Sequence, residues 1–172
     1  MTDRLTLKGL NQLSQQDFVE ILGGIFEHSP WVAELAFKQL PFASVEVLLQ
    51  SMSDIVRSSS EEKRLTLIRN HPELAGKEAD EGTLTEDSKK EQSGAGLNQC
   101  SAEELELLRD LNRRYSEKFE FPFVVAVTGL NKHQIIAAMQ SRLENNRQDE
   151  FATSINEICK IGKIRLDALI DG

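Results

Sequence analysis

The chain has 172 residues, of which 40% are hydrophobic and 28% charged, with a formal net charge of −8 and a pI near 5.0. These values are typical of a soluble globular protein that buries its own core, and they predict one domain over residues 1–172. The acidic balance argues against nucleic-acid binding, because contacts with phosphates usually need a basic face. Small anionic substrates are not excluded, since a local pair of donors can overcome a global charge.

The two chain ends and the cysteines bear on the compartment. No run of about 18 apolar residues is present, as a membrane span would require. The start, MTDRLTLKGL, lacks the apolar stretch of a signal peptide, and the end, DALIDG, carries no peroxisomal Ser-Lys-Leu signal. Cys100 and Cys159 are isolated in sequence, which favours thiols over a disulfide framework. We therefore predict a cytoplasmic protein that does not bind membranes.

Helical periodicity punctuated by N-cap residues is the strongest pattern along the chain. After Ser14, apolar side chains from Phe18 to Phe26 recur at helical spacing on one face. Ser29 is predicted to cap a second helix with Pro30 at its first position, where a missing N–H costs no hydrogen bond. Pro41 is predicted to close that helix.

Two further caps follow in chain order. Ser44 is predicted to cap a helix with an apolar stripe from Val45 to Val56. Ser60 begins a helix that is acidic in its first turn and basic near its end, as the helix dipole favours. In the polar segment after it, Thr85 is a plausible cap for a short helix through Gln92.

The second half of the chain adds three more helices. Ser101 and Glu104 form a capping-box pattern, Asn131 is the predicted cap of the next helix, and the last begins at about Asp149. The pattern predicts about seven or eight helices in all, without internal repeats, and hence an all-α multi-helix bundle.

The segment FEFPFVVAV, residues 119–127, does not fit a helix. Its composition is that of a strand, but a strand without a partner is not stable alone. We predict an extended, buried segment over about residues 119–128 that connects two helices. Its backbone N–H and C=O groups must then be bonded, and a ligand is one candidate for their partner.

The stretch RNHPELAGK, residues 69–77, raises the question of a catalytic histidine. Pro72 disfavours the helical conformation at His71, so His71 could simply end the preceding helix. Pro72 also fixes the backbone beside His71, however, and Gly76 permits close approach. Histidine is the side chain best suited to exchange a proton near neutral pH. On these residues alone, the helix-end interpretation is favoured.

A second polar stretch, SKKEQSGAGL, places Ser88, Glu91 and Gln92 close together if it is helical. A hydroxyl, a carboxylate and an amide on one face can hold a polar ring with several N–H and C=O groups. The composition alone favours a solvated surface helix instead. The three histidines of the chain show no zinc-ligand spacing, so no metal site is predicted.

Five stretches together resemble the OHCU decarboxylase family, which acts on 2-oxo-4-hydroxy-4-carboxy-5-ureidoimidazoline (OHCU). They are SPWVAELAF, LIRNHPELAGK, GTLTEDSKKEQSGAGL, LNRRYSEKFEFPFVVAV and RLENNRQDEFATSINEICKIGKIRL. The resemblance covers nearly the whole chain, and its motifs His-Pro-x-Leu-Ala-Gly, Ser-x-x-Glu-Gln and Phe-Pro-Phe are specific in combination. It implies the family's single-domain all-α fold, usually as a homodimer, in a bacterial-type member. It also implies decarboxylation of OHCU to (S)-allantoin, the last step from urate to allantoin, without metal or organic cofactor.

The resemblance also implies roles for the residues that match the family's motifs. His71 and Glu91 match its catalytic residues, His71 as acid and base and Glu91 as the carboxylate that orients the substrate. The implied substrate-binding residues are Pro72, Ser88, Lys89, Lys90, Gln92 and the backbone of Phe123, Val124, Val125, Ala126 and Val127.

Two residues depart from the family: this chain has Phe37 where tryptophan is common, and Thr128 where many relatives carry a basic residue. An alternative function is therefore that of a catalytically weakened or inactive helical binding or scaffold protein in purine catabolism. Another alternative is a cofactor-free decarboxylase of a related ureido acid. The helical face containing Arg113 and Tyr115 is a candidate dimer surface.

Overall fold

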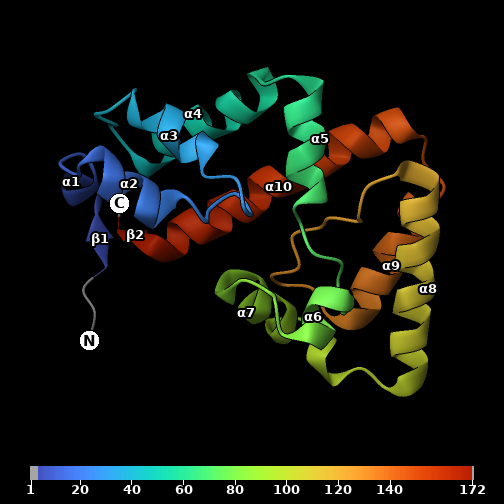
Figure 1. The fold of residues 1–172 in the computed structure, drawn as a ribbon. Helices are drawn as coiled ribbons and strands as arrows, with labels where there is room; N and C mark the ends of the chain where they lie inside the picture. Colours follow the sequence, from blue (N-terminus) through green and yellow to red (C-terminus); the bar gives the residue numbers. More distant parts are fainter. Residues whose placement is uncertain (1–3, 172) are drawn as a thin grey trace. The chain divides into compact units, whose positions relative to one another are not determined.

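The computed structural model describes residues 4–171, whose regular secondary structure is helical apart from one short pair of strands (Figure 1). In chain order the helices are α1 (Leu7–Leu10), α2 (Gln15–Leu22), α3 (Trp31–Phe37), α4 (Val45–Ser58), α5 (Glu61–Arg69), α6 (Lys77–Glu81), α7 (Glu86–Gly94), the 3₁₀ helix η1 (Leu97–Gln99), α8 (Ala102–Phe119), α9 (Lys132–Arg142) and α10 (Arg147–Leu169). Strands β1 (Leu5–Thr6) and β2 (Ile170–Asp171) are parallel, with Leu5 opposite Ile170. The all-α prediction is confirmed. The described part has more helices than predicted, because α1 and α6 are too short to show a helical period.

The predicted N-caps are formed at six helices. In each, the cap side chain accepts a hydrogen bond from the backbone N–H three residues further on, at Ser14, Ser44, Ser60, Thr85, Ser101 and Asn131. The capping box of Ser101 and Glu104 is reciprocal, as its sequence predicts. Such caps satisfy backbone N–H groups that have no partner inside the helix.

The start of α3 differs from the prediction. Pro30, not Ser29, is the N-cap residue and makes no side-chain cap. The Ser29 hydroxyl instead donates to the Glu27 carbonyl at 2.9 Å. The prediction of a Ser29 cap is therefore wrong, because a nearby carbonyl competes for the short hydroxyl side chain.

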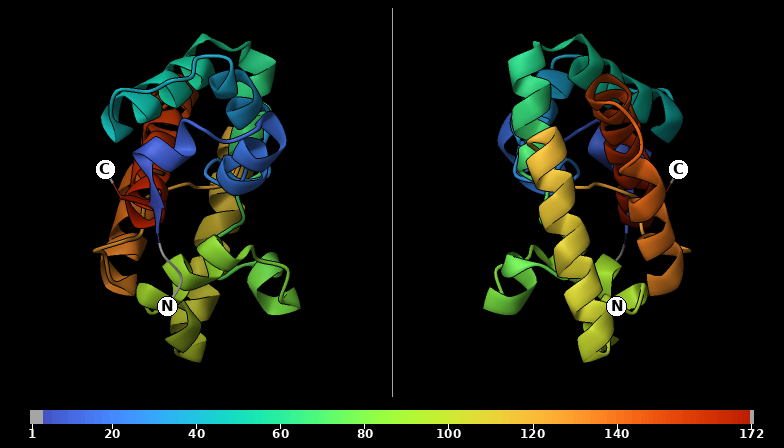
Figure 2. Two further views of the ribbon diagram at one scale, coloured as in Figure 1. Left: turned by 90° about the vertical axis from the view of Figure 1, so that its left-hand side faces the viewer. Right: turned by 90° about the vertical axis from the view of Figure 1, so that its right-hand side faces the viewer.

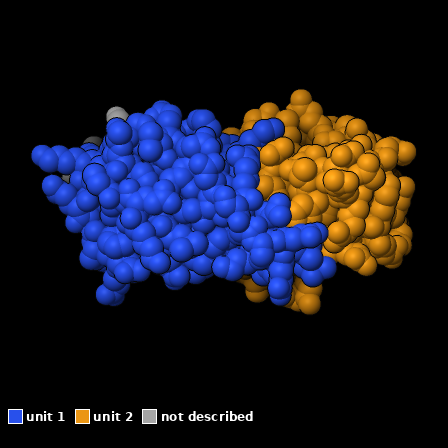
Figure 3. Space-filling model, turned by 90° about the horizontal axis from the view of Figure 1, so that it is seen from above, with its two compact units in different colours: residues 1–70, 158–172 blue, residues 71–157 orange. Residues whose placement is uncertain are grey.

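The described chain divides into two compact units, which Figure 3 shows in different colours. Unit 1 is assigned Met1–Asn70 and Ile158–Gly172, and unit 2 is His71–Glu157. Every residue predicted for the functional site belongs to unit 2. A single domain over residues 1–172 stays a prediction.

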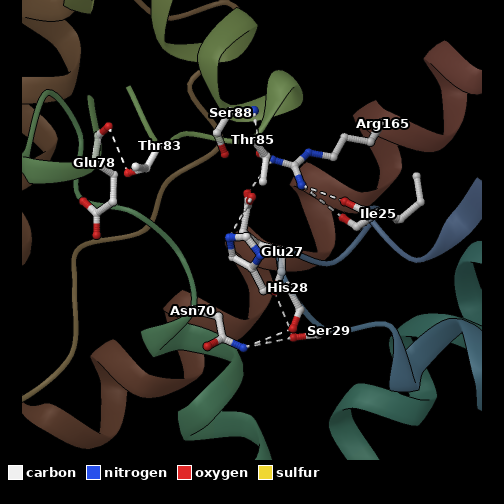
Figure 4. Close-up of polar contacts among 11 residues, drawn as sticks. Ile25, Glu27, His28, Ser29, Asn70, Glu78, Thr83, Thr85, Ser88 and Arg165 are labelled. Carbon is white, nitrogen blue, oxygen red and sulfur yellow. Dashed lines mark hydrogen bonds and ion pairs between the residues drawn. The ribbon is translucent and has the colours of Figure 1, made fainter. Parts of the chain in front are cut away.

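Unit 1 contains a buried ion pair. Arg165 Nη2 lies 3.0 Å from Glu27 Oε2, and the two side chains are only 4% and 1% exposed. Arg165 also donates to the carbonyl of Gly24 at 3.0 Å, and its bond with Ile25 is drawn in Figure 4. A buried pair of charges is stable only with such additional hydrogen bonds, so Arg165 ties α10 to the segment after α2.

Unit 2 is built around an aromatic cluster. Tyr115 and Phe119 of α8 and Phe121 and Phe123 of the following segment are each at most 2% exposed. The ring centroids of Tyr115 and Phe123 lie 5.3 Å apart in an edge-on arrangement, a geometry that aromatic pairs favour. Helix α8, continuous in the right-hand view of Figure 2, supplies one half of this cluster.

The aromatic cluster explains the strand-like composition of residues 119–128. Residues 121–128 are neither helix nor strand, and most of their large side chains are buried. Helix α8 extends to Phe119, so the irregular segment starts slightly later than predicted. The prediction of a buried connection between two helices is confirmed.

The suggested dimer surface on α8 does not hold as one exposed face. Tyr115 is fully buried, whereas the Arg113 side chain is 60% exposed. Residues two positions apart on a helix point to different sides. Arg113 instead forms surface ion pairs with Asp110 and Glu117.

The Glu104 side chain links α8 to α9, and its contacts make the stability of the fold depend on pH. It accepts from the Ser101 N–H at 2.9 Å and pairs with Lys132 Nζ at 2.8 Å. The bond with Lys132, followed by that with Ser101, lowers the pKa of Glu104 from 4.5 to about 2. Because the folded-state pKa is the lower one, the stabilisation is present above pH 4.5 and is lost as the pH falls toward about 2.

We therefore expect Glu104→Gln to reduce the thermal stability near neutral pH. It should also remove part of the fall in stability between pH 4.5 and about 2. Thermal unfolding followed by circular dichroism across this range checks both effects. The control is Glu103→Gln in the same turn, and an equal pH dependence in the two variants would contradict the expectation.

Candidate active site

His71 lies in the loop that follows α5, between Asn70 and the start of α6. Helix α5 ends at Arg69 with Asn70 as its C-cap, so the helix stops where Pro72 requires it to stop. His71 is only 6% exposed. The predicted helix stop is confirmed, and the structure adds that the imidazole is buried rather than solvated.

Two side-chain hydrogen bonds hold the loop after His71 at the peptide unit between Leu74 and Ala75. The N–H of Ala75 donates to Gln92 Oε1, and the carbonyl of Leu74 accepts from Asn112 Nδ2, both at 3.0 Å. Ala75 has a φ of 51°, a left-handed conformation that costs a residue with a Cβ about 1–2 kcal/mol. Two buried hydrogen bonds, worth about 1 kcal/mol each, are enough to offset that cost.

Close packing at Gly76 further restricts the same loop. A Cβ at Gly76 would lie 2.6 Å from the Cβ of Glu73, closer than two such atoms can approach. The Glu73 carboxylate accepts a long hydrogen bond of 3.4 Å from the Ser116 hydroxyl of α8. The expected close approach at Gly76 is therefore present, and it is made by the chain itself.

Helix α7 carries the Ser-x-x-Glu-Gln motif and has one buried face. The Thr85 hydroxyl accepts from the Ser88 N–H at 3.2 Å and starts the helix (Figure 4). Ser88 and Gln92 are 5% and 6% exposed, and Glu91 is half-buried beside them. The favoured interpretation of this segment as a solvated helix is thus wrong for one of its faces.

The bond between Gln92 and Ala75 brings the His-Pro and Ser-x-x-Glu-Gln motifs together. Lys89 and Lys90, in contrast, are exposed on α7. The structure therefore separates the predicted residues of this helix into a buried set and an exposed pair.

Only some of the backbone N–H and C=O groups of residues 123–127 are hydrogen-bonded within the protein. The Val124 carbonyl accepts from Arg142 Nη1 at 2.6 Å, the Ala126 N–H donates to Glu157 at 3.3 Å, and the Val127 carbonyl accepts from the Leu130 N–H at 2.9 Å. Within residues 4–171, the N–H and C=O of Val125 bond to no other protein group. Val125 is half-buried, and its N–H and C=O are therefore available to a ligand.

Arg142 is a residue of this region that the sequence did not indicate. Its Nε lies 2.7 Å from Oε1 of Glu150, which is fully buried and also accepts from the Tyr115 hydroxyl at 2.5 Å. Burial, followed by the bond to Glu150, raises the pKa of Tyr115 well above its usual range. The guanidinium also lies 4.4 Å from the Phe123 ring centroid, a cation–π contact. Its position in the last turn of α9 is the one local signal, and it is a weak one.

The described residues offer no other reactive cluster. Within residues 4–171, no group of three or more His, Cys, Asp and Glu side chains could hold a metal ion. Over the same range, no helix is both long and apolar enough to cross a membrane. Cys100 and Cys159 are free thiols, and burial raises the pKa of Cys100.

The fold and the site together define an all-α protein with a buried histidine on a fixed loop, a polar helix face and an open backbone segment in one unit. A family model described as OHCU decarboxylase matches residues 11–167, and the chain belongs to this family. The match confirms the resemblance that the combined motifs indicate.

Two relatives of similar length and one longer protein support the same family. The chain is 41% identical over 162 residues to the 2-oxo-4-hydroxy-4-carboxy-5-ureidoimidazoline decarboxylase of Haloferax volcanii, covering 94% of each chain. It is 37% identical over 166 residues to the decarboxylase of the same name from Halalkalicoccus jeotgali, covering 96% of this chain and 92% of the relative. It also matches 32% of the uric acid degradation bifunctional protein of Bacillus sp. strain TB-90, at 41% identity.

Solved structures share the fold. A crystal structure of (S)-allantoin synthase superimposes with a TM-score of 0.79 at 29% identity, covering 97% of this chain and 55% of that chain. A crystal structure of OHCU decarboxylase in the presence of (S)-allantoin gives a TM-score of 0.66 at 22% identity, covering 81% and 89%. The second likeness supports the fold alone.

Proposed function

We propose that this protein decarboxylates OHCU to (S)-allantoin, the last step of urate degradation to allantoin. Membership of the OHCU decarboxylase family over residues 11–167 is the observation that carries the proposal. The buried His71, together with the buried side of α7, supports it, since a histidine can exchange a proton near neutral pH and polar side chains can hold a small polar ring.

The chemistry explains why few side chains suffice. When the C–C bond to the carboxylate breaks and CO₂ leaves, its electron pair must be delocalised, which often requires an organic cofactor. The C=N of the substrate ring can accept this pair and form an enol-like intermediate. The protein then has to hold the ring in one orientation. It also has to assist the transfer of the proton from the substrate hydroxyl and to deliver a proton to one face of the ring carbon. We assign the proton transfers to His71.

The remaining predicted residues orient the substrate in this proposal. Glu91 accepts hydrogen bonds from ring or ureido N–H groups, and the Ser88 hydroxyl and the backbone at Val125 complete the set. Gln92 contributes its NH₂ group, because its oxygen already accepts from Ala75. Pro72 borders the substrate.

Substrate binding by the exposed Lys89 and Lys90 stays a prediction. A homodimer in the cytoplasm also belongs to this proposal, and light scattering of the purified protein tests the dimer.

The stereochemistry of the product tests the function. OHCU decays spontaneously to racemic allantoin, so optical activity, not allantoin itself, reports the enzyme. We expect circular dichroism of fresh OHCU to develop the (S)-allantoin signal at a rate proportional to protein concentration, with heat-denatured protein as the control. Without this rate increase the proposal fails.

Binding and turnover measurements distinguish the two alternatives, of which the inactive relative is the one suggested by the exposed Thr128. Binding of allantoin without turnover would indicate an inactive relative. Faster turnover of a related ureido acid would indicate a different substrate.

A further inference from the structure

The peptide unit between Leu74 and Ala75 is bonded on both sides by side-chain amides. Gln92 of α7 accepts from its N–H, and Asn112 of α8 donates to its C=O. This peptide is trans, so its N–H and C=O point in opposite directions. Two helices therefore hold one peptide unit from opposite sides, and we name this arrangement the amide clamp.

Asn112 is placed in the core chiefly for its donor group. It is 2% exposed, and within the described residues its Oδ1 has no hydrogen-bond partner. Its neighbours Leu108 and Leu111 on α8 are buried leucines, whose type would suit this position better on packing grounds alone. A buried acceptor without a partner is unfavourable. The bond from Nδ2 to the Leu74 carbonyl is thus the contact that requires an asparagine.

The clamp lies close to His71 along a stiff stretch of chain. Pro72 follows His71 and has a fixed φ, and Gly76 is packed against Glu73 at the other end of the loop. Only Pro72 and Glu73 lie between His71 and Leu74, whose carbonyl is clamped. A rotation of the peptide would change the direction in which the imidazole points.

We propose that Asn112 is a positioning residue for His71, acting through the Leu74 carbonyl in concert with Gln92. This inference rests on the proposed function only for its kinetic readout. Hydrogen exchange at the Ala75 amide reports the clamp independently of any activity, because that N–H is protected only while the loop is held against Gln92.

Two nearly isosteric variants test the donor. Asn112→Leu keeps the shape and removes the donor, and we expect about 10- to 100-fold lower kcat with a smaller change in KM, as for a misplaced catalytic group. Asn112→Asp can donate to Leu74 only when its carboxyl is protonated, and burial favours that protonated form. We therefore expect the ratio of kcat in Asn112→Asp to kcat in Asn112→Leu to rise as the pH is lowered.

A control on the same helix separates positioning from stability. Ser101→Ala removes the N-cap of α8 and destabilises that helix without contact with the loop. We expect this variant to have wild-type kcat. We also expect the Ala75 amide to lose no more protection than the fall in global stability explains. Asn112→Leu should accelerate exchange at Ala75, and Asn112→Ala replaces it if the leucine variant does not fold.

Three results would overturn the proposal. They are wild-type kcat in Asn112→Leu, a kcat ratio that does not depend on pH, and unchanged exchange at Ala75. If the wild-type protein does not turn over OHCU, the proposed function fails on its own. The exchange rate of Ala75 in the Asn112 variants then decides the clamp by itself.

Discussion

Replacement of His71 by alanine is expected to lower kcat for OHCU by about 10²–10⁴-fold, the range that a positioned general acid or base supplies. The imidazole is 6% exposed on a loop whose conformation is held by two helices. Neither alanine nor a water molecule in the vacated space can exchange the proton in the same position. The rate of appearance of the (S)-allantoin circular dichroism signal measures the effect.

The control is His133→Ala, because the His133 side chain is 73% exposed at the start of α9 in the same unit. It should have wild-type kcat. Since removing a buried imidazole leaves a cavity, His71→Asn serves as a second variant with more of the volume retained. A folded and fully active His71→Ala would remove the role assigned here while leaving the family membership intact.

Replacement of Arg142 by methionine is expected to destabilise the fold by about 3–5 kcal/mol, as when one partner of a buried ion pair is removed. Glu150 is 0% exposed and would lose the guanidinium that lies against it. The Val124 carbonyl would also lose its donor. Urea unfolding followed by circular dichroism measures the loss.

A double variant isolates the charge. Arg142→Met combined with Glu150→Gln buries no unpaired charge, and the amide oxygen introduced at position 150 can still accept from Tyr115, so much of the lost stability should return. Arg114→Met is the control, since that side chain is 55% exposed and a surface change of this kind alters stability by about 0.5 kcal/mol or less. Equal losses in the Arg142 and Arg114 single variants would show that the buried pair contributes no more than a surface charge.

The helix starts could be predicted because each cap is a local event. The hydroxyl of Ser44 or Ser60 and the N–H that it bonds are three residues apart, so the sequence contains both partners. Ser29 shows the limit of this logic. Its hydroxyl can cap the helix or donate to the nearby Glu27 carbonyl, and the sequence alone does not say which hydrogen bond is preferred.

The sequence motifs indicated a set of candidate residues but not the contacts that hold them. Gln92 was predicted as a substrate ligand, and its oxygen is bonded to the loop of His71. The partners of Asn112 and Arg142 lie on segments that are distant in sequence, so no periodicity or spacing announces these bonds. The sequence did not predict the left-handed conformation of Ala75 either, because glycine, not alanine, is the residue that usually indicates it.

The unbonded backbone N–H and C=O of Val125 have a consequence for how the sequence of such a protein can evolve. Its N–H and C=O are present whatever side chain the residue carries, so exchange of valine for another apolar residue leaves both groups in place. Only proline, which has no N–H, deletes one of them directly. Recognition by main-chain atoms is therefore shielded from most point mutations. Drift in the coding sequence would alter the packing of this segment well before it altered the groups offered to a ligand.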